Sequence, residues 1–121
     1  MLISSIGSEK DRWISTKAKL GEAKKSLLGD MILSSAFITY LGSFDGKYRA
    51  KAIHELWMPY LAEYKIETTS NFSLKEAIAN DEEVTDWLIK GLPNEQVCID
   101  NMIILTETRE THYPVLIDPQ G

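Results

Sequence analysis

The chain has 121 residues, a length that suits one domain or a piece of a longer protein, and its hydrophobic content of 44% is typical of globular chains. Its 18 acidic and 13 basic residues give a formal net charge of −5, which argues against binding nucleic acid or docking directly on an acidic polymer. It has no apolar run long enough to span a membrane and no signal-peptide features at its start, so we expect a soluble, cytoplasmic chain.

The first predicted element is a helix from the N-terminus to about residue 28. Ile6, Trp13, Leu20 and Leu27 recur every seven residues, which is one row of a coiled-coil seam. The companion row is small or polar and consists of Glu9, Thr16 and Ala23. This half-built seam fits equally the end of a coiled coil or an amphipathic helix packed on its own domain, with its Lys-rich face in solvent.

The next predicted helix covers residues 31–41 and is apolar nearly all round, so we expect it to be buried on most sides. Asp30 is placed to cap this helix or to lie in its first turn. Gly42 is placed to close it in the left-handed conformation. At Gly29 the pattern changes, which predicts either a break or a bend between the two helices.

The clearest amphipathic helix surrounds Pro59. Its apolar face comprises Ile53, Leu56, Trp57, Tyr60, Leu61 and Tyr64. Because Pro59 has no N–H and its ring clashes with the carbonyl of Glu55, we expect a kink or a restart there. Core packing is expected for Trp57, as for Trp13 and Trp87, since each tryptophan lies on an apolar helical stripe.

Two short helices are predicted next. Ser73 with Glu76 forms a capping box at the start of the first, and Asn80 with Glu83 forms a weaker one at the start of the second. The buried stripe of the second comprises Val84, Trp87 and Leu88. The tripeptide Gly-Leu-Pro at residues 91–93 is expected to end this helix, with Gly in the left-handed conformation.

The C-terminal region has a shorter hydrophobic period. Residues 102–106 ("MIILT") and 113–117 ("YPVLI") are short apolar runs rich in β-branched residues, which predicts two strands. The expected fold class is therefore mostly α with a short C-terminal β segment. A domain that ends on a strand and a turn is unusual, so we expect a piece of something larger.

Few residues suggest chemistry. Asp118 follows an apolar run, as the magnesium-binding acid of a nucleotidase does, but Pro119 replaces the second carboxylate and a turn acid is favoured. The chain lacks a G-x-x-x-x-G-K-[ST] phosphate loop. Cys98 is the single cysteine, and His54 and His112 lack ligands at metal-binding spacing, so no metal site is expected.

Several segments, taken in order, resemble the dynein heavy chain, and the resemblance covers nearly the whole sequence. Those segments are "EKDRW", "LLGDMILSSAFITYLGSFDGKYR", "NFSL", "VTDWLIKGLPNE", "IDN" and "PVLIDPQG". The resemblance, which looks axonemal, implies the place where the microtubule-binding stalk returns to the motor ring. Residues 1–28 would be the ring-proximal end of the stalk coiled coil. Residues 29–66 would complete the small subdomain of the fourth AAA+ module, and residues 67–121 would begin the α/β fold of the fifth.

The resemblance also implies roles for individual residues. Where an active module carries its phosphate loop, this chain has Asp118, Pro119, Gln120 and Gly121. Proline offers no N–H and no lysine follows, so this position would not bind a cofactor, and ATP with magnesium would belong to other modules of the parent. The residues implied in structural coupling are Ile6, Trp13, Leu20, Leu27, Trp57 and Trp87.

The leading hypothesis is a non-catalytic segment that couples the stalk to the ATP-driven ring. Its partners would be the rest of the heavy chain, namely the outgoing stalk helix and the neighbouring modules, with the microtubule contacted only indirectly and neither nucleic acid nor membrane bound. Its location would be cytoskeletal, including the ciliary axoneme. Two alternatives stay open: a small nucleotide-binding protein with its site at residues 118–121, and a helical interaction module that uses the Lys-rich first helix.

Overall fold

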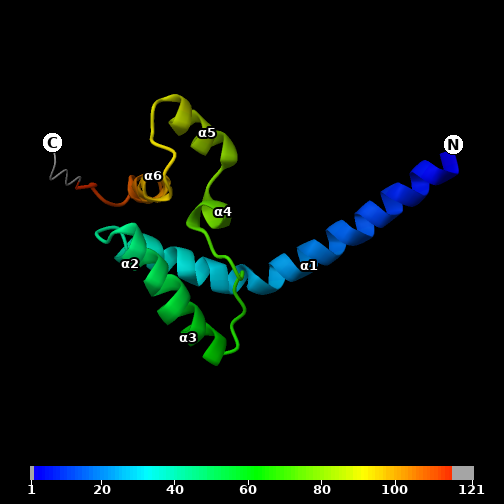
Figure 1. Ribbon diagram of the computed structural model, residues 1–121, viewed down its shortest axis with the longest axis horizontal. Coiled ribbons are helices and arrows are strands. Elements are labelled where there is room, and N and C mark those ends of the chain that lie inside the picture. Colours follow the sequence, from blue (N-terminus) through cyan, green and yellow to red (C-terminus); the bar gives the residue numbers. More distant parts are fainter. Residues whose placement is uncertain (1, 116–121) are drawn as a thin grey trace.

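The computed structural model consists of helices joined by loops (Figure 1). It describes the backbone of residues 2–115 and the side chains of residues 9–18, 20–21 and 24–115. The elements are α1 (Leu2–Tyr40), α2 (Gly46–Lys51), the π-helical η1 (Ala52–Trp57), α3 (Met58–Glu63), α4 (Leu74–Ile78), α5 (Asp81–Ile89) and α6 (Gln96–Thr108). The mostly helical architecture expected from the sequence is confirmed.

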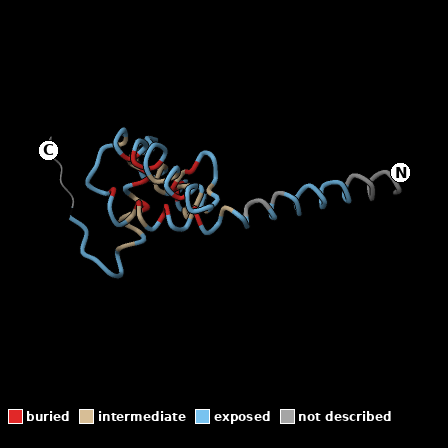
Figure 2. Tube along the Cα trace, turned by 90° about the horizontal axis from the view of Figure 1, so that it is seen from below, coloured by how far each residue is buried: buried red, intermediate tan, exposed pale blue. Residues whose placement is uncertain are grey.

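Helix α1 is continuous over 39 residues, so the junction at Gly29 is not a break. Its first part, residues 2–28, extends away from the other helices and is called the arm below (Figure 1). The remainder of α1 and the elements α2 to α6 form the body. Buried residues gather in the body, whereas the described residues of the arm are nearly all exposed (Figure 2). The chain is therefore a small helical core with one long projecting helix.

The core lies where the end of α1 meets η1, α3, α4, α5 and α6. It comprises Leu33, Phe37, Leu41, Ala52, Ile53, Leu61, Phe72, Leu74, Val84, Ile99 and Ile103. The prediction that residues 31–41 are buried on most sides is wrong, because only one side packs here. Met31 and Ile32 are each 39% exposed and Tyr40 is 67% exposed. An apolar helix can keep a second face uncovered when the described residues provide neighbours on one side only.

The rod made of α2, η1 and α3 confirms the restart expected at Pro59. Asp45 caps α2 by accepting a hydrogen bond from the Tyr48 N–H at 2.8 Å. The backbone then widens into η1, where the Met58 N–H donates to the Ile53 carbonyl five residues earlier. Helix α3 begins at Met58 with Pro59 in its first turn, directly after the widened backbone of η1.

The apolar face predicted for this rod divides into two rows. Ile53 and Leu61 are buried in the core, and Trp57 packs against it half-buried. The second row, made of Leu56, Tyr60 and Tyr64, is 55%, 58% and 64% exposed. The two rows lie on adjacent sides of one helix, and the described neighbours cover only the first.

The caps of the short helices follow the sequence in part. Asn80 caps α5 as predicted, with its Oδ1 accepting from the Glu82 N–H at 3.1 Å. Ser73 stands at the N-cap of α4, but its side chain makes no capping bond, so that capping box is absent. Gly91 has φ 101° and closes α5 as expected, with the Leu92 N–H donating to the Trp87 carbonyl at 3.0 Å.

The strand predicted at residues 102–106 is wrong, because these residues lie inside α6. Ile99 and Ile103 are one helical turn apart and both are buried. Packing on the core thus overrides the β-propensity of the Ile-Ile pair, which is a weak preference by itself. In the second predicted strand, residues 113–115 have no regular structure, and the rest lies outside the described residues.

Helix α3 ends in a turn that a glycine would stabilise. Lys65 has φ 60°, and the Ile66 N–H donates to the Leu61 carbonyl at 3.0 Å, which is the arrangement that Gly91 makes after α5. We expect Lys65→Gly to raise the free energy of unfolding by about 0.5–1 kcal/mol, because glycine adopts positive φ without steric cost. Urea denaturation measures this, and Lys65→Ala, which keeps Cβ, should show no gain.

Candidate functional site

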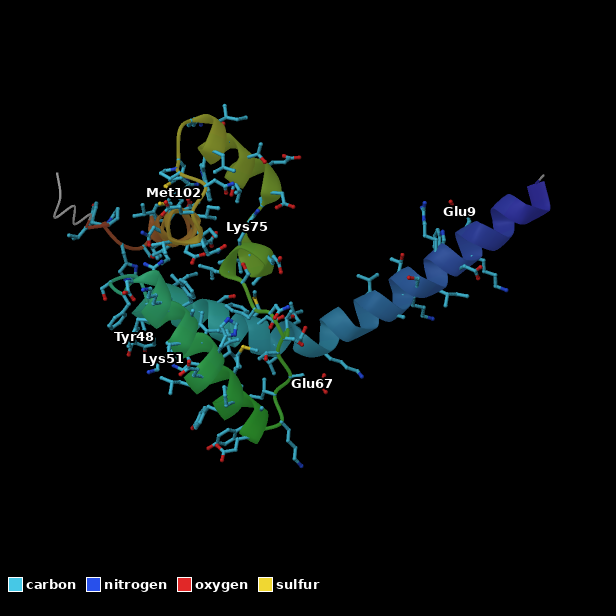
Figure 3. The ribbon with its side chains drawn as sticks, in the orientation of Figure 1. Glu9, Tyr48, Lys51, Glu67, Lys75 and Met102 are labelled. Atoms are coloured by element: carbon cyan, nitrogen blue, oxygen red, sulfur yellow. The ribbon has the colours of Figure 1, made fainter. Side chains whose placement is uncertain are left out.

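A short segment of the loop between α3 and α4 crosses α1 at the base of the arm. This segment, residues 67–69, is called the strap below, and Glu67 marks it in Figure 3. Asp30 accepts hydrogen bonds from Thr69, with Oδ1 2.8 Å from the backbone N and Oδ2 2.7 Å from Oγ1. The prediction that Asp30 caps a helix or lies in its first turn is therefore wrong, since Asp30 lies inside α1 and binds the strap.

Gly29 is the point of closest approach between α1 and the strap. A Cβ at this position would lie 2.3 Å from the Glu67 carbonyl oxygen and 2.6 Å from Cγ2 of Thr68. Real contacts are never that short, so no larger residue fits without moving backbone. The glycine is thus required by packing between two distant segments and not by a turn or a break in the helix.

The strap marks the change from exposed to buried residues along α1. On the arm, Trp13, Leu20 and Leu27 are 72%, 65% and 56% exposed, whereas Leu33 is 1% exposed. The prediction that Trp13 packs in a core is wrong for this chain, because the described core residues all lie at or after Leu33, beyond the arm. The side chain of Ile6, the first member of the seam row, lies outside the described residues.

The second junction of the body is built around Arg49, which is 3% exposed. Its Nε–H donates to the carbonyls of Leu41 and Phe44 at 3.0 and 2.9 Å, and Nη2 donates to the Gly42 carbonyl at 3.0 Å. These carbonyls lie at and just beyond the end of α1, where backbone acceptors have no helical donors. Nη2 also donates to Oδ1 of Asn101 in α6 at 2.6 Å.

This capping by Arg49 explains why Gly42 does not behave as predicted. Among the described glycines a positive φ is found at Gly91, so the left-handed turn expected at Gly42 is wrong. The guanidinium supplies the donors that a left-handed glycine would otherwise have supplied through the backbone. Arg49 also lies over the ring of Phe37, with Cζ 5.6 Å from the ring centroid, so the same side chain packs on the core.

Burial controls the electrostatics of this junction. Desolvation lowers the pKa of Arg49, while the negative charges of Asp100 and Asp45 oppose that shift. Desolvation likewise raises the pKa of the Asp100 carboxyl, opposed by the hydrogen bond from Gln96 and by the charge of Arg49. Gln96 donates to Oδ1 of Asp100 at 2.8 Å. Arg49 Nη1 has no hydrogen-bond partner among the described groups, so the nearby Asp100 charge is part of its compensation.

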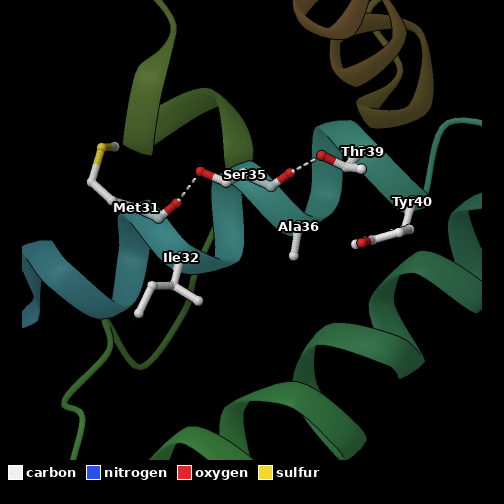
Figure 4. A pocket seen from close by; sticks show the side chains of 6 residues that line it. All are labelled: Met31, Ile32, Ser35, Ala36, Thr39 and Tyr40. Carbon is white, nitrogen blue, oxygen red and sulfur yellow. Dashed lines mark hydrogen bonds between the residues drawn. The ribbon is translucent and has the colours of Figure 1, made fainter.

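The exposed side of α1 beyond the strap forms an open, shallow groove of about 420 Å³ (Figure 4). It is lined by Met31, Ile32, Ser35, Ala36, Thr39 and Tyr40. The hydroxyls of Ser35 and Thr39 donate to carbonyls of their own helix at 2.8 and 2.7 Å, which leaves the surface largely apolar. The groove offers no pair of groups for proton transfer or nucleophilic attack.

The remaining predicted site residues divide into two groups. Trp57 and Trp87 pack half-buried against the core, as expected. The phosphate-loop position at residues 118–121 lies outside the described residues. Within the described part of the chain, no group of three His, Cys, Asp or Glu side chains could hold a metal, and no helix is long and apolar enough to cross a membrane.

Sequence reasoning missed Arg49, Asn101 and Thr69 as structural centres. The Tyr-Arg and Ile-Asp-Asn pieces were visible as parts of a resemblance, but nothing in their spacing showed that they meet. Thr69 gave no signal, because a threonine in a polar loop looks like any other loop residue.

Comparison with known families matches two separate regions of the chain. Residues 1–61 match the model of the "microtubule-binding stalk of dynein motor", and residues 85–121 match that of the "ATP-binding dynein motor region". Arg49 lies in the first region and Asn101 in the second, so their hydrogen bond joins the two. The chain is thus of the motor-protein class.

Individual relatives agree over almost the whole chain. The mouse dynein axonemal heavy chain 3 is 38% identical over 99% of this chain, and the dynein-1-alpha heavy chain of the flagellar inner arm I1 complex of Chlamydomonas reinhardtii is 34% identical over 98%. Human dynein axonemal heavy chain 10 is 34% identical over 98%. The chain belongs to the dynein heavy chain family. It spans 2–3% of the length of these relatives.

The geometry of the guanidinium makes Arg49 hard to replace. We expect Arg49→Lys to lower the free energy of unfolding by about 2–4 kcal/mol, because an ammonium cannot reach three carbonyls and Asn101 from one position. Arg12→Lys is the control, since Arg12 lies on the arm with its side chain 74% exposed and should shift stability by less than about 0.5 kcal/mol. Equal losses in urea denaturation would contradict the role assigned to Arg49.

The raised pKa of Asp100 makes stability depend on pH. The folded chain binds this proton more tightly than the unfolded chain, so the contribution of Asp100 to stability falls as pH rises from its ordinary pKa of 3.8 through its raised folded value. Asp100→Asn keeps the acceptor for Gln96 but cannot titrate. We expect the stability of wild type relative to Asp100→Asn to fall over that range in denaturation series. A difference independent of pH would count against this explanation.

Proposed function

We propose that this segment is a non-catalytic mechanical connector of a dynein heavy chain, which transmits load between the microtubule-binding stalk and the ATP-driven ring. The observation that supports this most directly is the buried Arg49, whose Nη2 donates to Asn101 at 2.6 Å. A coupling element must connect its two sides through a group that is bonded to both, so that one side cannot move without the other. Arg49 meets this requirement, because the same guanidinium also binds the carbonyls at the end of α1.

The arm supports the stalk side of the proposal. Its row of exposed apolar side chains at seven-residue spacing is one half of a coiled-coil seam, and such a row is stable in water only when a second helix covers it. In the proposed assembly the outgoing stalk helix of the same heavy chain covers Trp13, Leu20 and Leu27. The microtubule would then be contacted at a distance, through the stalk.

The ring side rests on the body. We propose that residues 1–28 are the ring-proximal end of the stalk, that residues 29–66 complete the fourth AAA+ module and that residues 67–121 begin the fifth. The strap crosses α1 at Gly29, which supports the first of these boundaries. Neighbouring modules of the heavy chain are the partners expected for the uncovered rows of α1 and α3.

No catalytic role is assigned to the segment itself. The described residues contain no group of three His, Cys, Asp or Glu side chains able to hold a metal. We propose that residues 118–121 are a degenerate phosphate loop and that ATP and magnesium bind in other modules of the parent motor. The names of the relatives, axonemal and flagellar dyneins, support a cytoskeletal location in the ciliary axoneme.

The proposal is tested by removing the hydrogen bond between Arg49 and Asn101 without disturbing the core. Asn101 is exposed, so Asn101→Ala should leave the fold intact while removing the acceptor of Arg49. In the full heavy chain we expect this variant to lower the ratio of microtubule-stimulated to basal ATP turnover. Asn101→Asp is the matched control, because its carboxylate still accepts from the guanidinium and should preserve the ratio.

Two results would count against the proposal. A full stimulation ratio in Asn101→Ala would show that the bond transmits nothing. A saturable heat of binding, measured by calorimetry when ATP is titrated into the 121-residue chain, would instead favour the alternative of a nucleotide site at residues 118–121.

A further inference from the structure

We propose that the strap is a clamp that fixes both the axial position and the rotation of α1 in the body, with Gly29, Asp30 and Thr69 as positioning residues. The effect of this clamp on motor activity rests on the proposed function. The clamp itself does not, because it follows from contacts inside the chain.

The axial position is fixed by the contact at Gly29. A helix that slips by one residue moves about 1.5 Å along its axis and presents a position rotated by about 100°. Such a slip would bring Leu28 or Asp30 against the strap, where even a methyl group would lie 2.3 Å from the Glu67 carbonyl oxygen. Slippage in either direction is therefore blocked by backbone.

Rotation is fixed by the pair of hydrogen bonds next to it. Asp30 uses one carboxylate oxygen for the Thr69 backbone N–H and the other for the Thr69 hydroxyl, at 2.8 and 2.7 Å. Two bonds from one carboxylate define an orientation as well as a distance. Turning α1 about its axis would break both bonds at once.

The clamp lies at the boundary between the exposed arm and the buried part of α1. Leu27 and Leu28, just before it, are 56% and 64% exposed, whereas Leu33, four residues after Gly29, is 1% exposed. Along α1 the strap therefore lies between the arm and the core, so a displacement of the arm acts on the strap contacts first. A clamped helix passes a tilt or a pull to the body as a whole, and an unclamped helix would dissipate it by turning or slipping.

Two glycines of α1 provide a matched test. Gly29 contacts the strap, whereas a Cβ at Gly21 would meet nothing within 4 Å. In the full heavy chain, spin labels are introduced at Ala18, on the side of the arm opposite the seam, and at Glu83 of α5, both exposed in this chain. They report the distance between arm and body. We expect Gly29→Ala to broaden or shift the distance distribution and Gly21→Ala to leave it unchanged. Equal distributions in both variants would overturn the proposal.

A milder variant decides the matter if Gly29→Ala prevents folding. Thr69→Val keeps the shape of the side chain and the backbone bond to Asp30 but removes the hydroxyl bond. We expect a smaller broadening of the same kind, and an unchanged distribution in Thr69→Val together with a misfolded Gly29→Ala would also overturn the clamp.

Motor assays separate the clamp from the coupling function. Loss of microtubule stimulation in both Thr69→Val and Asn101→Ala supports both proposals. Loss in Asn101→Ala alone, with unchanged label distances in both Thr69→Val and Gly29→Ala, removes the clamp but keeps the coupling. Full stimulation in both variants, with distances broadened in Thr69→Val, keeps the clamp and removes the coupling.

Discussion

The body depends on one buried guanidinium. The carbonyls at and beyond the end of α1 need donors, and in this chain Arg49 supplies them from a helix that folds back beside α1. Its burial against Phe37 fixes the distance between α1 and α2, and its bond to Asn101 fixes the distance to α6. Without this side chain, α1, α2 and α6 would lose the group that all three contact, and the carbonyls would lose their donors from the guanidinium, although the Leu41 carbonyl would keep the Phe44 N–H.

Helix α1 is thus held at two places about one-third of its length apart. The strap holds it at Gly29, and Arg49 binds the carbonyls that follow its last turn. Between these points one side of the helix is packed in the core. The arm before them contacts the strap at its base, where Thr69 lies 3.3 Å from the Ser26 hydroxyl, and its described residues are otherwise mostly exposed. The proposed mechanical role needs this division, because a helix passes on movement only when its base is firmly packed.

A feature could be predicted from the sequence when the residues that decide it are close together along the chain, and not when they are far apart. Pro59 acts on its own turn, and the restart there was predictable; so was the glycine turn at Gly91. Residues 102–106 of α6 were mistaken for a strand because isoleucine occurs in both states, and packing of Ile99 and Ile103 on the core decided for the helix. The role of Asp30 was missed because its partner is 39 residues away.

The sequence by itself determined the helical class of the chain, the restart at Pro59, the turn at Gly91 and the family, since these follow from local periodicity, from proline and glycine, and from an ordered set of short motifs. Only the tertiary structure decided which apolar rows are covered, why Gly29 must be glycine and what Arg49 binds. The long-range contacts among them join residues 38 to 52 positions apart, and no local pattern records which distant segments will meet.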